Sequence, residues 1–593
     1  MGIVRRSVMA AVVIGSAAGL AISAGGAAGA ATGTSGAAWG AAQDIPGLAA
    51  LANNGGGLNP AHVSAVGCGS AGSCVAVGDY DQPVAPGDTV PFVSAETDGT
   101  WGDAQPLAGL PALATGSTAN LTSVSCGTPD SCTAVGTFTA ATGGLQIFAV
   151  TETDGTWGTP TVLDTSVQDD VQSFGVDGLS CSAAGECALV GDYTPIPTGA
   201  VAVPVPFTVD ETAGIWGAVQ PLAGLSSLQP APGNLPAGFS SLTAVSCGAP
   251  GDCTAGGVYA YGAFQEPFIV SESGHVWGQP QALPALSSGG QYSEGPNEVT
   301  SVSCPDATDC AVVGTYFPQI NPSGEIFAVD EAAGAWGQAK TLSIPSADSV
   351  GNSGTDFVSC RSAGDCVIAG TAGEVVTATE SSAGAWGTAT AIPGTAPADG
   401  DEVFGLACVP KGDCTLLGLD TPGDQLPYEV FSATSPDGSP FGSVQEVASS
   451  GNDVPGSPRL ACPQNGQCAV TYNGLSSTSG LSFPQLVIER FPAAVTLSAS
   501  APKATYGAEQ AVTLTATASS PAGGTPTGTV SVTGPGNAFV CSITLTDGTG
   551  SCTLTSRRLP VGTDTLTAAY AGDDSYLSAS GTTTITIVRG HGH

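Results

Sequence analysis

Short apolar runs alternate with turn residues along most of this chain and define a repeat. Each run is rich in Val, Ile, Thr and aromatic residues, and Gly, Asp, Ser or Pro bound it, which is the pattern of short β-strands. One copy contains Leu121-Thr-Ser-Val-Ser-Cys126, Cys132-Thr-Ala-Val-Gly136, Ile147-Phe-Ala-Val-Thr-Glu152, and Asp154-Gly-Thr-Trp-Gly158 with Pro160-Thr-Val-Leu163. Four such strands in succession predict the blade of a β-propeller.

Pairs of cysteines separated by five residues mark the repeat, which recurs about every 56 residues. The eight pairs are Cys68/Cys74, Cys126/Cys132, Cys181/Cys187, Cys247/Cys253, Cys304/Cys310, Cys360/Cys366, Cys408/Cys414 and Cys462/Cys468. A ninth pair, Cys541/Cys552, completes the 18 cysteines. An even count at regular spacing predicts disulfides, here across the hairpin between the first two strands of each repeat. Metal ligation is the alternative, and the pairs have no histidine partners.

A Trp-Gly pair begins the fourth strand of most repeats, and it also occurs before the first cysteine pair. The eighth cysteine unit ends near Phe491 with three strands, whereas Trp39-Gly40 stands alone at the other end of the chain. We therefore expect residues 39–51 to supply the missing strand and to close an eight-bladed, all-β propeller over residues 39–491. Closure would hide the edge strands of an open array. Seven closed blades with leftover strands are the alternative.

The N-terminus has the pattern of an export signal. Arg5-Arg6 precedes an apolar run from Val8 to Ile22 and small residues that end at Ala30, which predicts a secretory signal peptide over residues 1–30 and a linker over 31–38. An uncleaved anchor is the alternative, although the run is short for a membrane span. We expect a secreted protein that does not insert into a membrane after cleavage.

The pattern changes after Phe491, where alternating Thr-rich strands replace the cysteine repeat. Thr505-Tyr-Gly507, Gly524-Thr-Pro-Thr-Gly-Thr-Val-Ser531, Leu559-Pro-Val-Gly562 and Ala569-Tyr-Ala-Gly-Asp573 resemble the bacterial Ig-like repeat family over residues 492–588. The resemblance implies a β-sandwich that serves as a spacer or adhesion module and carries no catalytic residues. Residues 589–593 form a short tail.

The charge of the chain excludes several functions. Its 11 Lys and Arg face 49 Asp and Glu, for a net charge of −38, which excludes nucleic acid as a partner. No Lys or Arg lies between Ala31 and Ala339.

The turn Asp154-Gly-Thr-Trp157 is similar to a shortened Asp-box. The repeats with such turns resemble an exported, actinobacterial-type propeller. Sialidase chemistry would need an arginine cluster for the substrate carboxylate, so we do not expect it.

A glutamate sits five residues before the blade tryptophan in five repeats. These residues are Glu96, Glu152, Glu211, Glu272 and Glu331. Paired acids could cleave glycans, but residues repeated around a ring usually belong to the scaffold. The alternative to a catalytic role is that these glutamates are exposed residues at strand ends or in turns.

The sequence has four histidines, His62, His275, His591 and His593. They are too scattered to predict a zinc triad or a Ser-His-Asp arrangement.

Loops of variable length concentrate on one face of the predicted ring, between the second and third strands and between repeats. Examples are Asp79–Pro91, Asp192–Pro206 and Thr371–Glu374. Aromatic residues recur where the second strand enters this loop, and they are Tyr80, Phe138, Tyr193, Tyr259 and Tyr316. We predict that they bind a ligand by stacking; packed strand ends, and neutral drift of the loops, are the alternatives.

These patterns lead to one principal hypothesis and two alternatives. The principal hypothesis is a secreted, non-enzymatic binding or adhesion protein that presents loops to a glycan or protein ligand. The alternatives are a polysaccharide-active hydrolase or lyase and a structural component of the cell envelope. No catalytic residue, metal site or cofactor is predicted, and the oligomeric state is left open. Binding of Ca²⁺ by the surplus carboxylates is the alternative, although the loop pattern of a Ca²⁺ site is absent.

Overall fold

The computed structural model describes residues 38–589 with internal gaps, so the predicted signal peptide and residues 31–37 of the predicted linker lie outside the described residues, whereas Ala38 belongs to the first strand. The gaps are 53–60, 71, 82–87, 98–99, 111–117, 141–143, 166–170, 197–202, 229–238, 262–263, 284–285, 287–296, 318–323, 343–355, 372–373, 382–383, 396–400, 411, 421–428, 437–438, 450–457, 464–466, 476–481, 521–524 and 574–575. Among the described residues, no helix is long and apolar enough to cross a membrane.

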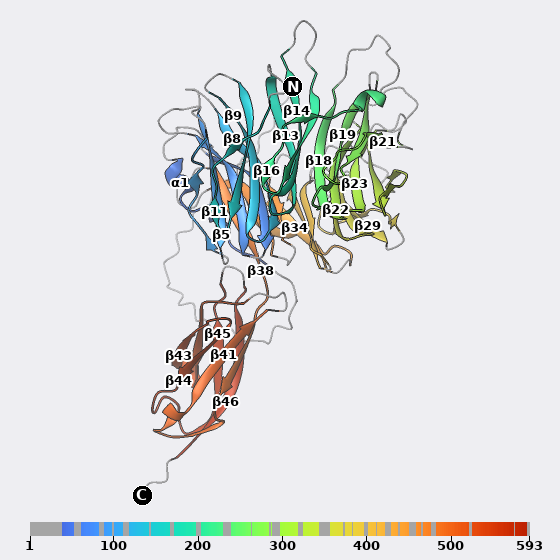
Figure 1. Cartoon of the computed structure of the whole chain (residues 1–593). Helices are drawn as coiled ribbons and strands as arrows, with labels where there is room; N and C mark the ends of the chain where they lie inside the picture. The colour runs from blue at the N-terminus through green and yellow to red at the C-terminus, as the bar shows by residue number, and fades with distance from the viewer. Residues whose placement is uncertain are drawn as a thin grey trace, which may run out of the picture. The chain divides into compact units, whose positions relative to one another are not determined.

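The protein is all-β, and its repeats fold into antiparallel sheets of four or five strands (Figure 1). The first sheet contains β3 (Ala61–Ser70), β4 (Ser73–Asp81), β5 (Thr89–Thr97), β6 (Thr100–Trp101) and β7 (Gln105–Pro106). The second contains β8 (Ala119–Thr128), β9 (Ser131–Thr139), β10 (Leu145–Thr153), β11 (Thr156–Trp157) and β12 (Thr161–Val162). The third contains β13 (Val171–Ala183), β14 (Glu186–Pro195), β15 (Val205–Thr212), β16 (Ile215–Trp216) and β17 (Gln220–Pro221). The fourth contains β18 (Ser241–Ala249), β19 (Asp252–Tyr261), β20 (Phe264–Ser271) and β21 (Gln281–Ala282).

The remaining repeats follow the same plan. The fifth sheet contains β22 (Glu298–Asp306), β23 (Asp309–Tyr316), β24 (Glu325–Ala332), β25 (Ala335–Trp336) and β26 (Lys340–Thr341). The sixth contains β27 (Phe357–Ser362), β28 (Asp365–Thr371), β29 (Val375–Ser381), β30 (Ala385–Trp386) and β31 (Thr390–Ala391). The seventh contains β32 (Glu402–Cys408), β33 (Cys414–Asp420), β34 (Glu429–Ser435) and β35 (Gln445–Ser449). The eighth contains β36 (Arg459–Ala461), β37 (Ala469–Leu475) and β38 (Ser482–Arg490), and it is completed from the N-terminus by β1 (Ala38–Trp39) and β2 (Gln43–Asp44).

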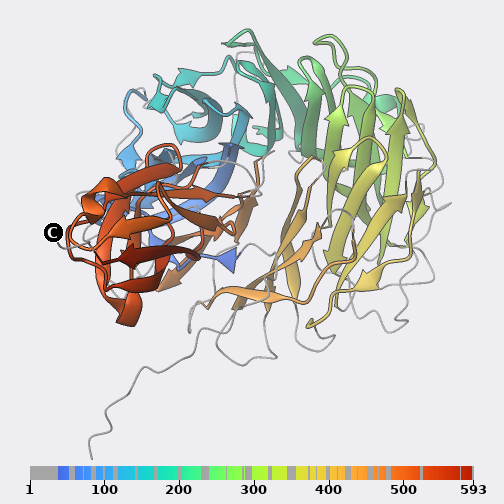
Figure 2. The same cartoon turned by 90° about the horizontal axis from the view of Figure 1, so that it is seen from below.

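The sheets lie side by side around a ring (Figure 2). The first strands of neighbouring sheets contact one another in order, and β3 of the first sheet contacts β36 and β37 of the eighth. In the eighth sheet, Trp39 lies opposite Glu489 and Gln43 opposite Leu486. The predicted pairing of the two chain ends is therefore present. The segment supplies two short strands, and helix α1 (Leu48–Leu51) follows them.

Separate apolar cores form between neighbouring sheets. The core between the eighth and first sheets contains Ile45, Leu48, Val63 and Ile488, so the N-terminal segment contributes side chains as well as strands. In the first five sheets, the first two strands approach closely at a repeated glycine. A Cβ atom at Gly136 would lie 2.0 Å from the carbonyl oxygen of Asn120, which explains the glycine at this place in the second strand.

All nine predicted disulfides are present, and the described residues contain no free cysteine. The first eight connect residues on adjacent strands of one sheet, as Cys187 lies opposite Cys181. They stabilise single sheets and make no covalent link between neighbours. Because each closes only a short loop, the loop-entropy estimate is about 2 kcal/mol per bond.

The second cysteine of each of the first eight pairs is also buried in the packing of the sheets. Cys74 is 1% exposed and belongs to the core between the eighth and first sheets, and Cys253 is 5% exposed. The reason is that the second strand of each sheet lies between the first and third strands, so neighbouring sheets cover its side chains. Cys74 and Cys253 are therefore structural residues that are closed to solvent, and neither is accessible to a ligand.

Neighbouring sheets are joined by a series of serine hydrogen bonds. The serine before the first cysteine of one repeat accepts a hydrogen bond from the backbone N–H of the first cysteine of the next. The bonds are 2.9–3.1 Å long and are accepted by Ser125, Ser180, Ser246, Ser303 and Ser359. The last two repeats and the first have Ala407, Ala461 and Gly67 at this position, so these sheets have no hydroxyl there.

The C-terminal residues form two further sheets. One contains β39 (Ala494–Ala499), β41 (Thr513–Ser519) and β44 (Thr549–Thr553). The other contains β40 (Lys503–Thr505), β46 (Ala579–Val588), β45 (Gly562–Tyr570), β42 (Thr529–Thr533) and β43 (Phe539–Thr544). A single apolar core includes side chains from both, such as Leu514, Val530 and Leu566. Cys541 in β43 and Cys552 in β44 link the two sheets covalently.

Short 3₁₀ helices occur in both regions of the chain. One covers Leu225–Ser227 in the third repeat, and two cover Glu509–Ala511 and Pro535–Asn537 in the C-terminal region.

Candidate functional site

The five repeated glutamates lie at or next to the end of the third strand of the first five sheets, directly opposite the tryptophan that begins the fourth strand. Glu211 lies opposite Trp216, for example, and Glu272 opposite Trp277. The alternative of exposed strand ends is wrong for four of the five, because Glu96, Glu152, Glu211 and Glu272 are 3–5% exposed. In the second sheet, the carboxylate of Glu152 accepts a hydrogen bond from the N–H of Gly155 in the following turn, which explains its burial.

Burial changes the acidity of these glutamates. It raises the pKa of Glu211 to about 7, with a further contribution from Glu186. It raises the pKa of Glu272 to about 8, and the carboxylates of Asp210, Asp252 and Glu186 add to the effect. Removal from water destabilises the charged form, and neighbouring negative charges do the same. Two glutamates with raised pKa values, Glu211 and Glu272, therefore lie at the contact between the third and fourth sheets.

The repeated tryptophans bridge neighbouring sheets. The indole N–H of Trp277 donates to Asp210 of the preceding sheet at 3.0 Å, and that of Trp386 donates to Asp330 at 3.0 Å. Where the preceding sheet has no acceptor at this position, the indole N–H lacks a partner, as in Trp157. The tryptophans are thus part of the packing between sheets, as their repetition predicts.

His275 departs from the repeat. It occupies the turn after the third strand of the fourth sheet with φ of 62°, a left-handed conformation, and its N–H donates to the carbonyl of Gly251 at 3.1 Å. The equivalent turn position is glycine in other sheets, as at Gly214 and Gly334. A side chain in this conformation costs roughly 1–2 kcal/mol. Strained residues of this kind concentrate at functional sites.

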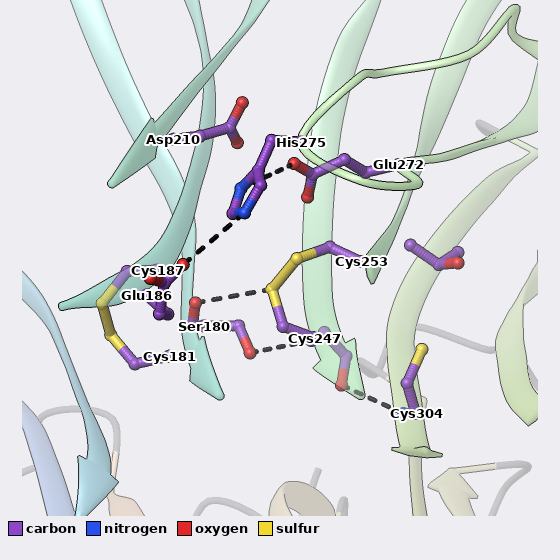
Figure 3. Close-up of a disulfide and its surroundings, with 12 residues drawn as sticks. Ser180, Cys181, Glu186, Cys187, Asp210, Cys247, Cys253, Glu272, His275 and Cys304 are labelled. Atoms are coloured by element: carbon purple, nitrogen blue, oxygen red, sulfur yellow. Dashed lines mark hydrogen bonds and ion pairs between the residues drawn. A yellow bond between two sulfur atoms is a disulfide. The ribbon is translucent and has the colours of Figure 1, made fainter. Parts of the chain in front are cut away.

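Acidic side chains from two sheets surround the His275 ring (Figure 3). Its Nε2 lies 3.8 Å from Oε2 of Glu186 in the third sheet, and its Nδ1 lies 3.9 Å from Oε1 of Glu272. The hydroxyl of Thr212 is 3.3 Å from Nδ1. One oxygen of Glu186 is fixed by the backbone N–H of Ala213, at 3.0 Å. The turn conformation therefore places the imidazole between two carboxyl groups.

The ring also lines a cleft of about 450 Å³ on the third sheet. Its polar lining includes Asp210, Gln220 and His275, and its apolar lining includes Trp216 and Ile215. Ile215 is 74% exposed. An apolar wall with a few converging polar groups is typical of a small-molecule or sugar site. Burial raises the pKa of Asp210, against the opposing effects of the Trp277 hydrogen bond and of His275.

A related cleft of about 480 Å³ lies between the fifth and sixth sheets. Asp330, Glu331 and Glu380 occupy the places of Asp210, Glu211 and Glu272, and Gly384 occupies the turn where the fourth sheet has His275. The positively charged residue that lines this second cleft is Lys340. The two clefts therefore have equivalent acidic residues, but only the cleft on the third sheet is lined by an imidazole.

The aromatic residues predicted to bind a ligand lie elsewhere. Tyr80, Phe138, Tyr193 and Tyr259 are 0–7% exposed within the cores between sheets, and Tyr316 packs partly buried against the core between the fourth and fifth sheets. The structure does not bring them together into one site, and their role in ligand binding stays a prediction. Parts of the variable loops, 82–87, 197–202 and 372–373, lie outside the described residues.

The other histidines do not join the cluster. His62 lies in β3, where burial and Arg459 lower its pKa, and His591 and His593 fall outside the described residues. No group of three or more His, Cys, Asp or Glu side chains within the described ranges is arranged to hold a metal ion.

Comparisons with known proteins identify the C-terminal region. Residues 497–588 match the family of bacterial Ig-like domains, group 3, which confirms the predicted resemblance. No curated protein matches the chain. The match covers the C-terminal region alone, so it says nothing about the ring of sheets.

Several solved structures are similar to the chain at low sequence identity. A Hadza microbial sialidase is 12% identical, with 57% of this chain and 72% of the sialidase covered and a TM-score of 0.32. A polysaccharide lyase that acts on ulvan is 10% identical over 54% and 78%, with a TM-score of 0.30. An α-L-arabinanase of Penicillium chrysogenum is 11% identical over 60% and 89%, with a TM-score of 0.28.

These comparisons correct one prediction. We expected a non-enzymatic binding or adhesion protein, and that hypothesis is contradicted, because the similar structures include sialidases, an endosialidase, a polysaccharide lyase and an arabinanase. The hydrolase or lyase alternative is the better supported one. The similarity is too low to transfer any residue, so the chemistry has to be argued from the side chains of this chain.

Proposed function

We propose that this protein is a secreted, polysaccharide-active hydrolase whose site is the cleft at His275. The observation that carries the proposal is the placement of His275 in a turn position that is glycine in the second, third, fifth and sixth sheets, with its ring nitrogens facing the half-buried Glu186 and the buried Glu272. An imidazole can give and take a proton at neutral pH. Held at a cleft with an aromatic wall, it is suited to general acid–base catalysis on a sugar.

Hydrolysis of a glycosidic bond needs one acid and one base. In the proposed reaction, His275 donates a proton to the leaving glycosidic oxygen as the bond to the anomeric carbon breaks, and water attacks that carbon and loses its proton to Asp210. Glu272 acts as a positioning residue, since it faces Nδ1 of His275 and keeps its own proton at neutral pH. Trp216 and Ile215 provide the surface on which the sugar ring packs.

The charge of the site favours hydrolysis over elimination. A lyase removes a proton next to a uronate carboxylate, and the carboxylate must be neutralised for this step. The sheets that form the cleft contain no Lys or Arg, because none occurs between Ala31 and Ala339. The cleft therefore offers no Lys or Arg side chain to neutralise a uronate carboxylate.

The scaffold that we propose is an eight-bladed propeller closed by the N-terminal strands, followed by an Ig-like β-sandwich. The order of contacts around the sheets and the pairing of Trp39 with Glu489 support it. We propose boundaries of 39–491 for the propeller and 492–588 for the sandwich. Export from the cell is supported by nine disulfides, which persist in oxidising compartments.

The test is an activity screen of the purified protein against polysaccharides, scored by the release of reducing ends. His275→Gly is the decisive variant, since it restores the residue that other sheets use at this turn and should therefore fold. We expect it to lower kcat/KM by a factor of about 10² or more, the usual contribution of a general acid. His62→Gln, which changes a histidine outside the cluster, is the matched control.

Two results would refute the proposal. One is a protein that releases no sugar from any glycan offered, which would leave a structural component of the envelope as the remaining hypothesis. The other is an activity that His275→Gly and His62→Gln reduce equally, which would place the chemistry outside this cleft.

A further inference from the structure

Positive charge is concentrated in the C-terminal region of this acidic chain. Residues 492–593 hold four of the 11 Lys and Arg but only five of the 49 Asp and Glu. The four cations are Lys503, Arg557, Arg558 and Arg589, and all of them are exposed. Every ion pair found among the described residues joins other groups, so none of these pairs neutralises the four side chains.

Two strands bring Lys503 and Arg589 to the same end of the larger C-terminal sheet. β40 pairs with the last residues of β46, where Lys503 lies opposite Thr586. The backbone N–H of Tyr506 donates to the carbonyl of Val588 at 2.8 Å, and Arg589 follows directly in the chain. Tyr506 is 44% exposed. An exposed aromatic ring therefore belongs to the same group as these two cations.

The buried side chain of Glu509 connects the other two arginines to this end. Its Oε2 accepts hydrogen bonds from the backbone N–H groups of Gly507 and Arg557, both at 2.9 Å. The turn at Gly507 is thereby joined to the segment that carries Arg557 and Arg558. The guanidinium of Arg558 lies 5.9 Å from the centre of the Phe539 ring and donates to the carbonyl of Phe539, so its position is fixed before any ligand binds.

The described acids of this region are buried or lie at the opposite end. Glu509 and Asp564 are 0% and 5% exposed. Asp573 follows the last residue of β45, whereas the first residue of β45 lies opposite Ile587, beside the cations. β45 has nine residues, so its two ends are roughly 26 Å apart. The turn of Asp547 lies at the same far end, because β43 and β42 pair there with the end of β45.

We infer that this cationic end, made up of Lys503, Tyr506, Arg557, Arg558 and Arg589, is a binding surface for an anionic polysaccharide. The fork of N–H groups on an arginine matches the two oxygens of a carboxylate, and an exposed tyrosine packs against a sugar ring. The inference goes beyond the proposed function, because the surface lies on other sheets than the His275 cleft and its ligand is bound rather than cleaved.

Two other occupants fit the surface less well. Almost all of the 49 acids lie in the ring of sheets, so two copies of the chain held close together would repel each other. An anionic membrane offers the same negative charge, but stable contact with it requires apolar side chains that enter the lipid. The exposed aliphatic side chains that the structure describes at this end are Val561 and Val588, and both are small.

The test measures binding of the full secreted chain to immobilised polygalacturonate at neutral pH and low salt. Polygalacturonate in which every carboxylate is methyl-esterified is the matched control ligand, because it has the same sugar rings without the charge. We expect the charged polymer to bind at least about tenfold more tightly. The difference should shrink as salt is added, since the cations are exposed.

Matched variants separate this surface from the net charge of the protein. Lys503→Gln and Arg557→Gln each remove one positive charge and should weaken binding about two- to fivefold, the range for an exposed ion pair. Lys340→Gln removes the same charge in the fifth sheet and should have no effect. Tyr506→Ser should weaken binding at high as well as low salt, because stacking is not screened. The hydrogen bond from Arg557 to Glu509 uses the backbone, so Arg557→Gln retains it.

Several results would overturn the inference. They are equal binding of the charged and the esterified polymer, and equal effects of Lys503→Gln and Lys340→Gln. Tighter binding to vesicles of equal parts phosphatidylglycerol and phosphatidylcholine would assign the surface to a membrane, and tighter binding to duplex DNA would reduce it to a general attraction for polyanions. Self-association that Lys503→Gln abolishes, without polysaccharide binding, would assign it to a second copy. Because none of these measurements depends on cleavage at His275, failure of this inference and failure of the hydrolase proposal are distinguishable.

Discussion

The buried glutamates predict an unusual dependence of stability on pH. Glu489 shows the effect most simply, because it is 8% exposed, lies opposite Trp39 in the closing sheet, and accepts a hydrogen bond from the N–H of Cys468. Burial raises its pKa from 4.5 to about 7, with a smaller contribution from Asp413. The folded protein therefore binds a proton at Glu489 more tightly than the unfolded chain does.

The sign and size of the effect follow from linkage. A carboxyl whose pKa is higher in the folded state contributes stability that is fully present below pH 4.5 and is lost as pH rises to about 7. The loss amounts to about 3 kcal/mol for this one group. Glu211, Glu331 and Glu380 show increases of similar size, so we expect the ring to be more stable at pH 5 than at pH 8.

The variant Glu489→Gln isolates one group, because glutamine retains an acceptor oxygen and cannot ionise. Relative to the unmodified protein, it should be more stable by about 3 kcal/mol at pH 8 and nearly unchanged at pH 5. Denaturant unfolding monitored by tryptophan fluorescence is a suitable assay, since all seven tryptophans lie between Trp39 and Trp386 and report on the ring. Glu446→Gln, at an exposed position, is the control.

The reasoning would be refuted by a ring that loses stability as pH falls from 8 to 5. It would also be refuted by a Glu489→Gln variant whose effect is the same at both pH values. The second result would mean that Glu489 is already neutral throughout, or that water reaches it more easily than its burial indicates.

Two further predictions concern the contacts between sheets. Ser303→Ala should lower the free energy of unfolding by about 1–2 kcal/mol, because it leaves the N–H of Cys360 without its acceptor, and the same denaturant assay measures this. An unchanged midpoint would mean that water replaces the hydroxyl. Ala95→Ser should raise stability by up to about 1 kcal/mol, since Ser271 at the equivalent position accepts a hydrogen bond from an indole and the N–H of Trp157 lacks a partner. A decrease would show that the added hydroxyl finds no indole.

The repeat made most of the fold predictable from the sequence. Cysteine spacing located a disulfide in each hairpin, and the isolated Trp39-Gly40 identified the strand that pairs with the last sheet. Such features depend on residues that are neighbours in the chain or that recur at a fixed period. The burial of Cys74 and Cys253 was not predicted, because it depends on the neighbouring sheets. The segment at Leu48–Leu51 also differed, because a short helix there places Leu48 in the core next to the first sheet.

The candidate site was not predicted, because its residues meet across two sheets. Spacing shows that Glu272 precedes a turn, but it does not show that a neighbouring sheet covers the carboxylate. The contacts of His275 with Glu186 and Thr212 likewise join residues from different repeats. One signal was present in the sequence, since aligning the turns would have set His275 against Gly214 and Gly334.

The pairing of the two chain ends has a consequence for biosynthesis. Asp44 and Gln485, whose side chains are hydrogen-bonded, are 441 residues apart, so the first strands to leave the ribosome must wait for almost the last ones. Until β38 is made, β1 and β2 have no partner strand in the chain, and the last sheet cannot be completed. The ring can therefore close only after synthesis has passed Arg490.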